Sequence, residues 1–195
     1  MLLTMRATMK EAASLQDDSA SAIARAMSLG ALMGARGNSG VILSQIMRGL
    51  AEGLGSSVSF GPGEMALAFE MASLLAYKAV SSPCEGTMLT VIKDAAKAAK
   101  QAAASNGSHM LFLMEAVVKE AKSSVERTPE LLDILKEAGV VDAGGQGLYI
   151  IFEGILFYLR GDVGKMRLLE TKYPVVSQLA FVAAGSQKTE EKIYG

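Results

Sequence analysis

Residues 30–50 read GALMGARGNSGVILSQIMRGL, and this stretch decides the fold class. On both sides of its glycine-rich centre, apolar residues recur three and four positions apart, which is the period of an α-helix. Asn38 and Ser39 are residue types that begin helices, whereas Gly34 and Gly37 are of the type that ends them. The stretch therefore predicts two helices joined by a short glycine turn.

The same helical period continues outward in both directions. Ser19 can cap the first of these helices, and residues 56–63, SSVSFGPG, predict a loop through their Ser, Gly and Pro content. Thr128 as a cap and Pro129 in the first turn predict that a new helix begins there and stops at Gly139. The predicted helices cover residues 17–34, 38–55, 63–80, 87–104, 110–125, 128–139 and 148–161, so the predicted fold class is all-α.

Length and composition favour one intracellular domain. The 195 residues fit one domain, or one domain followed by a tail, and half of them are hydrophobic. Nineteen Lys and Arg residues balance twenty Asp and Glu residues, so neither nucleic acid nor an anionic membrane is an expected partner. The single cysteine, Cys84, excludes an internal disulfide and is typical of a reducing compartment.

The first residues do not predict a secretion signal, because Arg6 and Lys10 would interrupt its apolar segment. The chain also contains no uncharged apolar run of the roughly 18 residues that a membrane-spanning helix needs. A cytoplasmic location without a membrane span is therefore expected.

The glycine-rich segment 33–43 has the features of an anion site. Its glycines allow a ligand to approach the backbone closely, and Asn38 and Ser39 lie where a helix begins. Unpaired N–H groups and the positive end of the helix dipole suit a phosphate there. Arg36 adds a positive charge nearby.

Two further glycine junctions introduce helices, at residues 85–88 (EGTM) and 141–147 (VDAGGQG). Asp142 could accept hydrogen bonds from a ribose hydroxyl or an adenine amino group, and the adjacent glycines would leave room for a flat ring. Glycines between helices are also common as C-caps and at points of close packing. From the residues alone, a ligand site and a purely structural role both remain open.

Other familiar sites lack their residues. No Gly-Lys-Ser/Thr follows a glycine loop, as in a Walker A motif, and no GxGxxG follows a predicted strand. His109 is the only histidine, and Cys84 has no histidine close to it in sequence, which disfavours a catalytic triad and a zinc site.

Three segments in this order, GALMGARGNSGVILSQIMRGL, EGTMLTVIKDAAKAA and VVDAGGQGL, resemble the ATP-binding domain of bacterial fatty acid kinase A. That domain is related to the nucleotide-binding L subunit of dihydroxyacetone kinase. The resemblance covers about residues 1–165, and it implies an antiparallel barrel or bundle of amphipathic helices with the nucleotide at one rim. Residues 166–195 would be a linker or the start of a following domain.

The resemblance also implies a set of nucleotide-binding residues. The first group would lie at the phosphates, the second would form the adenine and ribose pocket, and the third would close it. These groups are Gly37, Asn38, Ser39 and Gly40; Thr87 and Met88; and Asp142, Gly144 and Gly145. The implied ligand is ATP or ADP with Mg²⁺.

In the family, aspartates of a Pro-Asp-Gly-Asp-Thr-Gly-Thr-Asn motif hold the metal ions, and this motif would immediately precede Met1. The resemblance therefore implies an N-terminally truncated domain that lacks its metal ligands and is inactive alone, because Mg²⁺ neutralises much of the phosphate charge. An apolar seam left by missing upstream helices would favour a homodimer.

The leading hypothesis is the ATP-binding domain of a kinase whose acceptor, by the same resemblance, is a fatty acid presented by a partner protein. A dihydroxyacetone-kinase-type phosphotransfer subunit is an alternative within that class. A nucleotide-sensing or scaffolding helical domain without turnover is the alternative from another class. A third alternative is a carrier protein that holds an apolar ligand inside the barrel.

Overall fold

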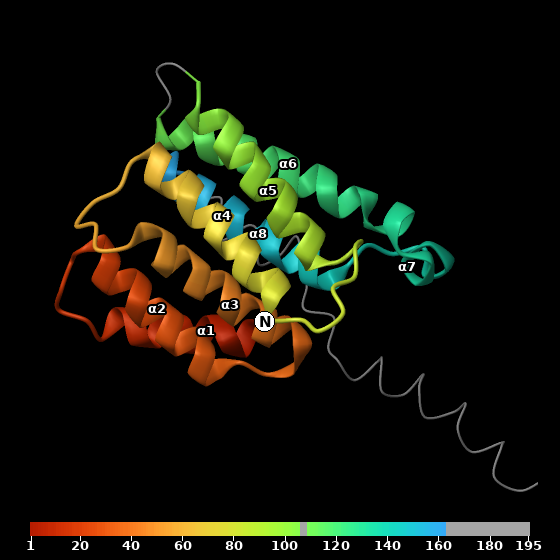
Figure 1. Ribbon diagram of the computed structural model, residues 1–195, viewed down its shortest axis with the longest axis horizontal. Helices are drawn as coiled ribbons and strands as arrows, with labels where there is room; N and C mark the ends of the chain where they lie inside the picture. Colours follow the sequence, from red (N-terminus) through yellow and green to blue (C-terminus); the bar gives the residue numbers. More distant parts are fainter. Residues whose placement is uncertain (106–108, 163–195) are drawn as a thin grey trace, which may run out of the picture. The chain divides into compact units, whose positions relative to one another are not determined.

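The structure is a computed structural model that describes residues 1–105 and 109–162. Within these ranges every regular element is a helix, which confirms the all-α prediction. Met1–Arg160 form one compact unit, and Figure 1 shows its helices lying alongside one another. The helices are α1 (Leu2–Ala13), α2 (Ala20–Gly34), α3 (Gly37–Leu54), α4 (Pro62–Lys78), α5 (Met88–Ala103), α6 (Met110–Leu131), α7 (Asp133–Ala138) and α8 (Ala143–Leu159). The predicted tail, residues 166–195, lies outside the described residues.

Helices that follow one another in sequence pack against one another. This holds for each neighbouring pair from α1 to α6, and α8 then packs on both α5 and α6. Short connections between successive helices produce antiparallel neighbours. As a result, α3, α5 and α8 all begin at the same end of the unit, and α4 ends there.

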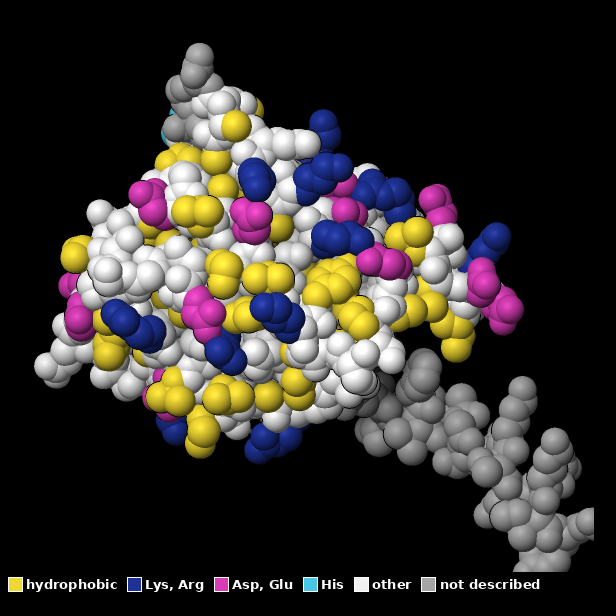
Figure 2. Space-filling view, in the orientation of Figure 1, with side chains coloured by type: hydrophobic (Ala, Val, Ile, Leu, Met, Phe, Trp, Pro, Cys, Tyr) yellow, Lys and Arg dark blue, Asp and Glu magenta, His cyan; other side chains and the backbone are white. Residues whose placement is uncertain are grey.

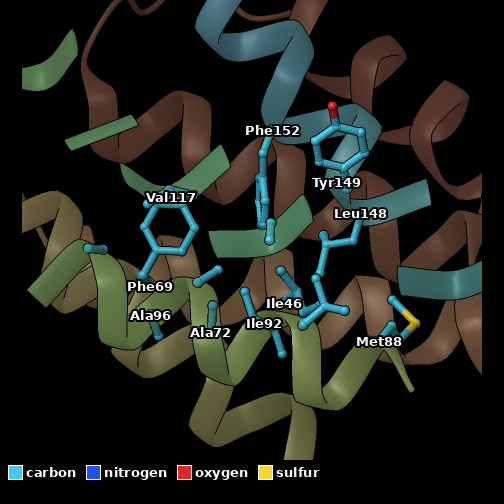
Figure 3. Packing of buried hydrophobic residues seen from close by; sticks show 14 of the residues in the cluster. Ile46, Phe69, Ala72, Met88, Ile92, Ala96, Val117, Leu148, Tyr149 and Phe152 are labelled. Atoms are coloured by element: carbon cyan, nitrogen blue, oxygen red, sulfur yellow. The ribbon is translucent and has the colours of Figure 1, made fainter. Parts of the chain in front are cut away.

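The core is built from one face of each long helix. In α5, small and branched apolar residues from Met88 to Ala102 are buried, whereas Lys93, Lys97 and Lys100 lie on the exposed face. Figure 3 shows Leu148 and Phe152 of α8 pointing towards the α5 and α4 side chains. The Phe69 and Phe152 rings meet edge to face with 5.3 Å between their centroids, a favoured aromatic geometry.

Helices α3 and α4 approach until their backbones touch. A Cβ atom added to Gly49 would lie 2.5 Å from both the nitrogen of Ala72 and the oxygen of Met71. One turn further along α3, Gly53 faces Ala68 in the same way. Ala68 and Ala72 are completely buried. The spacing of four residues on both helices thus creates a continuous line of contact without side chains between the two backbones.

The prediction that a helix begins at Thr128 and Pro129 is wrong. Helix α6 continues through Pro129 to Leu131, and the break falls at Leu132. Proline cannot donate the backbone hydrogen bond to the carbonyl four residues earlier, at Val125. The Thr128 hydroxyl donates to that carbonyl instead, at 2.7 Å, so the helix loses no hydrogen bond there. The predicted stop at Gly139 is confirmed: this residue ends α7 in the left-handed conformation, with φ +65°.

One helix start and one whole helix also differ from the prediction. Helix α8 begins at Ala143 rather than Leu148, so the glycines that indicated a loop lie in its first turns. Residues Leu2–Ala13 form α1, which the sequence analysis did not include among the predicted helices. Its buried Thr4 packs on the end of α2, where its hydroxyl lies 3.4 Å from the carbonyl of Gly34.

The surface mixes charges of both signs. Figure 2 shows Lys and Arg side chains among Asp and Glu side chains on one face of the protein. Interhelical ion pairs include Lys100 with Glu70 at 3.2 Å and Arg160 with Glu115 at 2.7 Å. Exposed pairs of this kind contribute roughly 0–1 kcal/mol each. None of the described helices combines the length and the apolar character that crossing a bilayer requires.

Candidate functional site

A pocket of about 440 Å³ lies where α3, α5 and α8 begin and α4 ends. This volume is within the range of small-molecule sites, roughly 300–1,000 Å³. The pocket combines polar side chains from the helix starts with apolar ones from the helix flanks. Its lining consists of Asn38, Ser39, Val41, Ile42, Ala79, Val80, Ser81, Ser82, Cys84, Thr87, Met88, Leu89, Asp142 and Gly144.

The pocket brings together six of the nine site residues named from the sequence. They come from three junctions that are far apart in the chain. They are Asn38, Ser39, Thr87, Met88, Asp142 and Gly144. Residues from three separate segments of the sequence thus lie in one pocket, and their role in nucleotide binding stays a prediction.

The other three predicted residues do not line the pocket. Gly37 is the first residue of α3, just before the pocket-lining Asn38, and has φ +65°, a left-handed conformation that favours glycine. A Cβ atom on Gly40 would lie 2.9 Å from the Thr4 hydroxyl, and one on Gly145 would lie 2.8 Å from a Val91 methyl group. Gly40 and Gly145 are therefore explained by close packing, which the sequence analysis had left open as an alternative.

The three helix starts at the pocket differ in how their N–H groups are paired. The Thr87 hydroxyl accepts from the nitrogen of Leu89 at 3.3 Å, and the Asp142 carboxylate accepts from that of Gly145 at 2.6 Å. Helix α3 has no side-chain cap among the described residues, because Arg36 occupies the capping position. The first-turn N–H groups of α3 remain as donors at the wall of the pocket. Three positive helix ends and these open donors favour an anionic ligand.

A wall of the pocket that the sequence analysis missed is the α4–α5 connector, residues 79–87. Five of its residues before Thr87 line the pocket: Ala79, Val80, Ser81, Ser82 and Cys84. Loop composition alone could not assign them, because only the packing of α4 against α5 brings the connector over the start of α3.

Thr128, near the end of α6, contacts two of the segments that line the pocket, at Asp142 and at Gly86. Its hydroxyl is fully buried and accepts a hydrogen bond from the backbone nitrogen of Asp142 at 3.0 Å. On the other side, a Cβ atom on Gly86 would lie 2.9 Å from the carbonyl oxygen of Thr128. The end of α6 thus supports both the Asp142 turn and the α4–α5 connector.

We expect Thr128→Val to destabilise the protein by about 2 kcal/mol, because it leaves the Val125 carbonyl and the Asp142 N–H without partners. For a domain of this size the melting temperature would fall by roughly 4–8 °C, measurable by circular dichroism. Thr8→Val is a matched control, since the Thr8 hydroxyl donates to the Thr4 carbonyl within α1, and the helical N–H bond to that carbonyl remains. Equal melting temperatures for the two variants would contradict this role of Thr128.

The described residues do not by themselves fit a divalent metal site. Asp142 is the only carboxylate that lines the pocket, and one of its oxygens already accepts from Gly145. In residues 1–105 and 109–162, no cluster of three or more His, Cys, Asp or Glu side chains could hold a metal ion. Mg²⁺ requires octahedral oxygen ligands, usually with one or two carboxylates. No chemical step through a metal can be derived from these residues.

A second cavity, of about 260 Å³, is entirely apolar. It lies among α2, α3, α4, α6 and α8. It is lined by Ala20, Ile23, Ala24, Met27, Met47, Leu50, Leu54, Phe60, Met65, Phe69, Met114, Phe152 and Ile155. It contributes no polar group, so it has no chemistry in common with the first pocket.

Comparison with known proteins identifies relatives across almost the whole chain. The DAK2 domain matches residues 1–157. Protein YloV of Bacillus subtilis (strain 168) is 43% identical over 194 residues, which is 99% of this chain and 35% of that protein. An uncharacterized protein of Staphylococcus aureus (strain USA300) is 41% identical over 200 residues, covering 100% of this chain and 35% of its own length. The chain thus spans about a third of the length of these relatives.

Proposed function

Since the chain belongs to the DAK2 domain family, we propose that it is the nucleotide-binding part of a kinase and binds ATP in the pocket where α3, α5 and α8 begin. The observation that carries the proposal is the convergence of three helix starts on one pocket, with the N–H groups of α3 left uncapped. Phosphate oxygens are suited to such donors. The family is similar to the L subunit of dihydroxyacetone kinase, which agrees with a nucleotide as the ligand.

The chemistry of the lining divides the pocket between the two ends of a nucleotide. Asn38 and Ser39 at the start of α3 would hold the phosphates, with the open N–H groups of the same turn. The apolar flank made by Ile42, Val80 and Leu89 would cover the base. In this arrangement the described residues bind and orient ATP.

The acceptor that we propose is a fatty acid held by a separate binding protein. The γ-phosphoryl group would pass from ATP to a carboxylate oxygen of the fatty acid, leaving ADP and an acyl phosphate. This finer assignment rests on the similarity of the three sequence segments to fatty acid kinase A. Dihydroxyacetone-type phosphotransfer, in which a hydroxyl oxygen is the acceptor, is the alternative with the same pocket.

Transfer would also require Mg²⁺, which neutralises charge on the phosphates when it is bound. The described residues offer a single pocket carboxylate, so we propose that this chain alone binds nucleotide without efficient turnover. The same observation favours the second candidate function, a nucleotide sensor without turnover. The two candidates share the pocket and differ only in whether phosphoryl transfer follows binding.

Calorimetric titration of ATP into this chain tests the proposal directly. We expect a dissociation constant between about 10 μM and 1 mM, or roughly 4–7 kcal/mol of binding free energy. Replacing Mg²⁺ by EDTA should change it less than about threefold, because few metal ligands are contributed by these residues. Absence of binding at millimolar ATP would contradict the proposed function. Binding that EDTA abolishes would show that a metal site exists after all.

A further inference from the structure

A cluster of four polar side chains joins the α4–α5 connector to the two helices that flank it, outside the pocket. Tyr77 is on α4, Thr90 and Lys93 are on α5, and Glu85 is in the connector. We name these residues the Glu85 cluster. None of the four lines the pocket, so the cluster has no part in the binding chemistry described above.

The Glu85 carboxylate accepts three hydrogen bonds from the two flanking helices. One oxygen accepts from the Tyr77 hydroxyl at 2.9 Å and from the Lys93 ammonium at 2.7 Å. The other oxygen accepts from the Thr90 hydroxyl at 2.6 Å. The Lys93 nitrogen also lies 5.6 Å from the centre of the Tyr77 ring, a cation–π contact. One side chain of the connector is thereby tied to both α4 and α5.

The cluster extends into the backbone of the connector. The Thr90 oxygen accepts from the nitrogen of Gly86 at 2.9 Å while its hydrogen is donated to Glu85. Gly86 has φ +79°, a left-handed conformation, and packs against the end of α6. The Thr87 hydroxyl then donates to the carbonyl of Cys84 at 2.8 Å. The path from the carboxylate to the pocket-lining residues Cys84 and Thr87 is therefore continuous.

We propose that Glu85 is a positioning residue that holds the α4–α5 connector in place as a preformed wall of the pocket. Hydrogen bonds to a charged acceptor are stronger than neutral ones, and here they converge on one group. Preorganising a loop in its bound conformation increases affinity, because less ordering is left for the binding step. The effect on ATP affinity rests on the proposed function, whereas the effect on the connector does not.

The pKa values within the cluster agree with this geometry. Partial burial by itself would raise the pKa of Glu85, but hydrogen bonds from Lys93, Thr90 and Tyr77 outweigh it and lower the pKa below its usual value. For Lys93, burial would lower the pKa, but hydrogen bonds to Glu85 and Tyr77 raise it above its usual value. Both groups are therefore charged at neutral pH, as the proposed arrangement requires.

Cys84 provides a reporter for the connector. It is the single cysteine of the chain, it is exposed, and its thiol lies 3.4 Å from the carbonyl of Glu85. Its rate of reaction with a thiol reagent such as 5,5′-dithiobis(2-nitrobenzoate) reports on this segment alone. Because Cys84 also lines the pocket, bound ATP should slow the same reaction.

The test compares Glu85→Gln with Glu70→Gln in the full chain. Glu70 is a matched control, since it also forms an exposed ion pair from the α4 side to α5, with Lys100, but lies away from the connector. An amide nitrogen at position 85 cannot accept the Thr90 hydroxyl hydrogen. We expect Glu85→Gln to speed the Cys84 reaction about fivefold or more and to weaken ATP binding roughly three- to tenfold. The Glu70→Gln variant should match the wild type in both measurements.

A second pair of variants guards against a general loss of structure. Thr90→Val removes the hydroxyl that links Glu85 to Gly86 and should reproduce both effects. Thr90→Ser keeps a hydroxyl and should match the wild type in both measurements. Circular dichroism melts establish that each variant is folded at the assay temperature. The proposal is overturned if Glu85→Gln and Glu70→Gln show equal thiol rates. If Cys84 reacts faster in Glu85→Gln but ATP never protects it, the connector role stands and the proposed function fails.

Discussion

Replacing Gly49 by alanine should lower the stability of the protein by about 3 kcal/mol, although alanine is the better helix former by roughly 1 kcal/mol. The added Cβ would meet backbone atoms of Met71 and Ala72, and backbone atoms cannot rotate away as a side chain can. The two helices would have to separate along their whole line of contact. Thermal unfolding followed by circular dichroism should show a fall of roughly 6–12 °C in the melting temperature.

Gly154→Ala is the matched control for this prediction. Gly154 lies in the interior of α8, and apart from its chain neighbours and the backbone of its own helix no described atom is within 4 Å of the position its Cβ would take. Its replacement should leave the melting temperature unchanged or raise it slightly, through helix propensity alone. If Gly49→Ala melted within about 2 °C of the wild type, the close approach of α3 and α4 would be wrong.

Replacing Asp142 by alanine should weaken ATP binding by about thirtyfold or more, and should cost about 1 kcal/mol of stability as well. The carboxylate lines the pocket and also caps α8 through the nitrogen of Gly145. Loss of an N-cap typically costs about 1 kcal/mol. A hydrogen bond to a charged group is worth roughly 1.5–3 kcal/mol, and its loss on the ligand side accounts for the change in affinity.

Two further variants separate the two roles of Asp142. Asparagine caps a helix about as well as aspartate, so Asp142→Asn should keep the wild-type melting temperature while ATP affinity falls. Ser19→Ala removes the cap of α2, where the Ser19 hydroxyl accepts from Ala22 at 3.3 Å, and lies away from the pocket. That variant should lose stability and keep ATP affinity. Wild-type affinity in Asp142→Ala would remove this residue from the proposed site.

The parts of the fold that the sequence predicted are those determined by local rules. Ser19 caps α2 and Gly139 ends α7, as the residue types indicated. Each of these depends on backbone preferences or hydrogen bonds within one turn. Element ends of this kind can be identified without knowledge of the neighbouring helices.

The sequence predictions were wrong where an unusual hydrogen bond or a contact with another helix overrides a local sequence preference. Proline in the first turn of a helix is common, so Pro129 indicated a helix start; the hydroxyl of Thr128 instead lets α6 continue. Gly145 indicated a junction before the helix, but it lies in the first turn of α8, and a glycine is needed there because its Cβ would lie 2.8 Å from a Val91 methyl group of α5. The connector residues such as Cys84 have no local signal at all, and only the packing of α4 on α5 assigns them to the pocket.

The contact of α3 with α4 has a mechanical consequence for the pocket. Asn38 lies eleven residues before Gly49 on α3, a distance of roughly 16 Å along the helix, and Val80 lies just beyond the end of α4. Since no α3 side chain separates the two backbones at Gly49 and Gly53, the two helices should move as one unit, with the pocket-lining residues Asn38 and Val80 carried at its end. The distance between Asn38 and Val80 therefore depends on how Gly49 and Gly53 pack against α4, at a point outside the pocket.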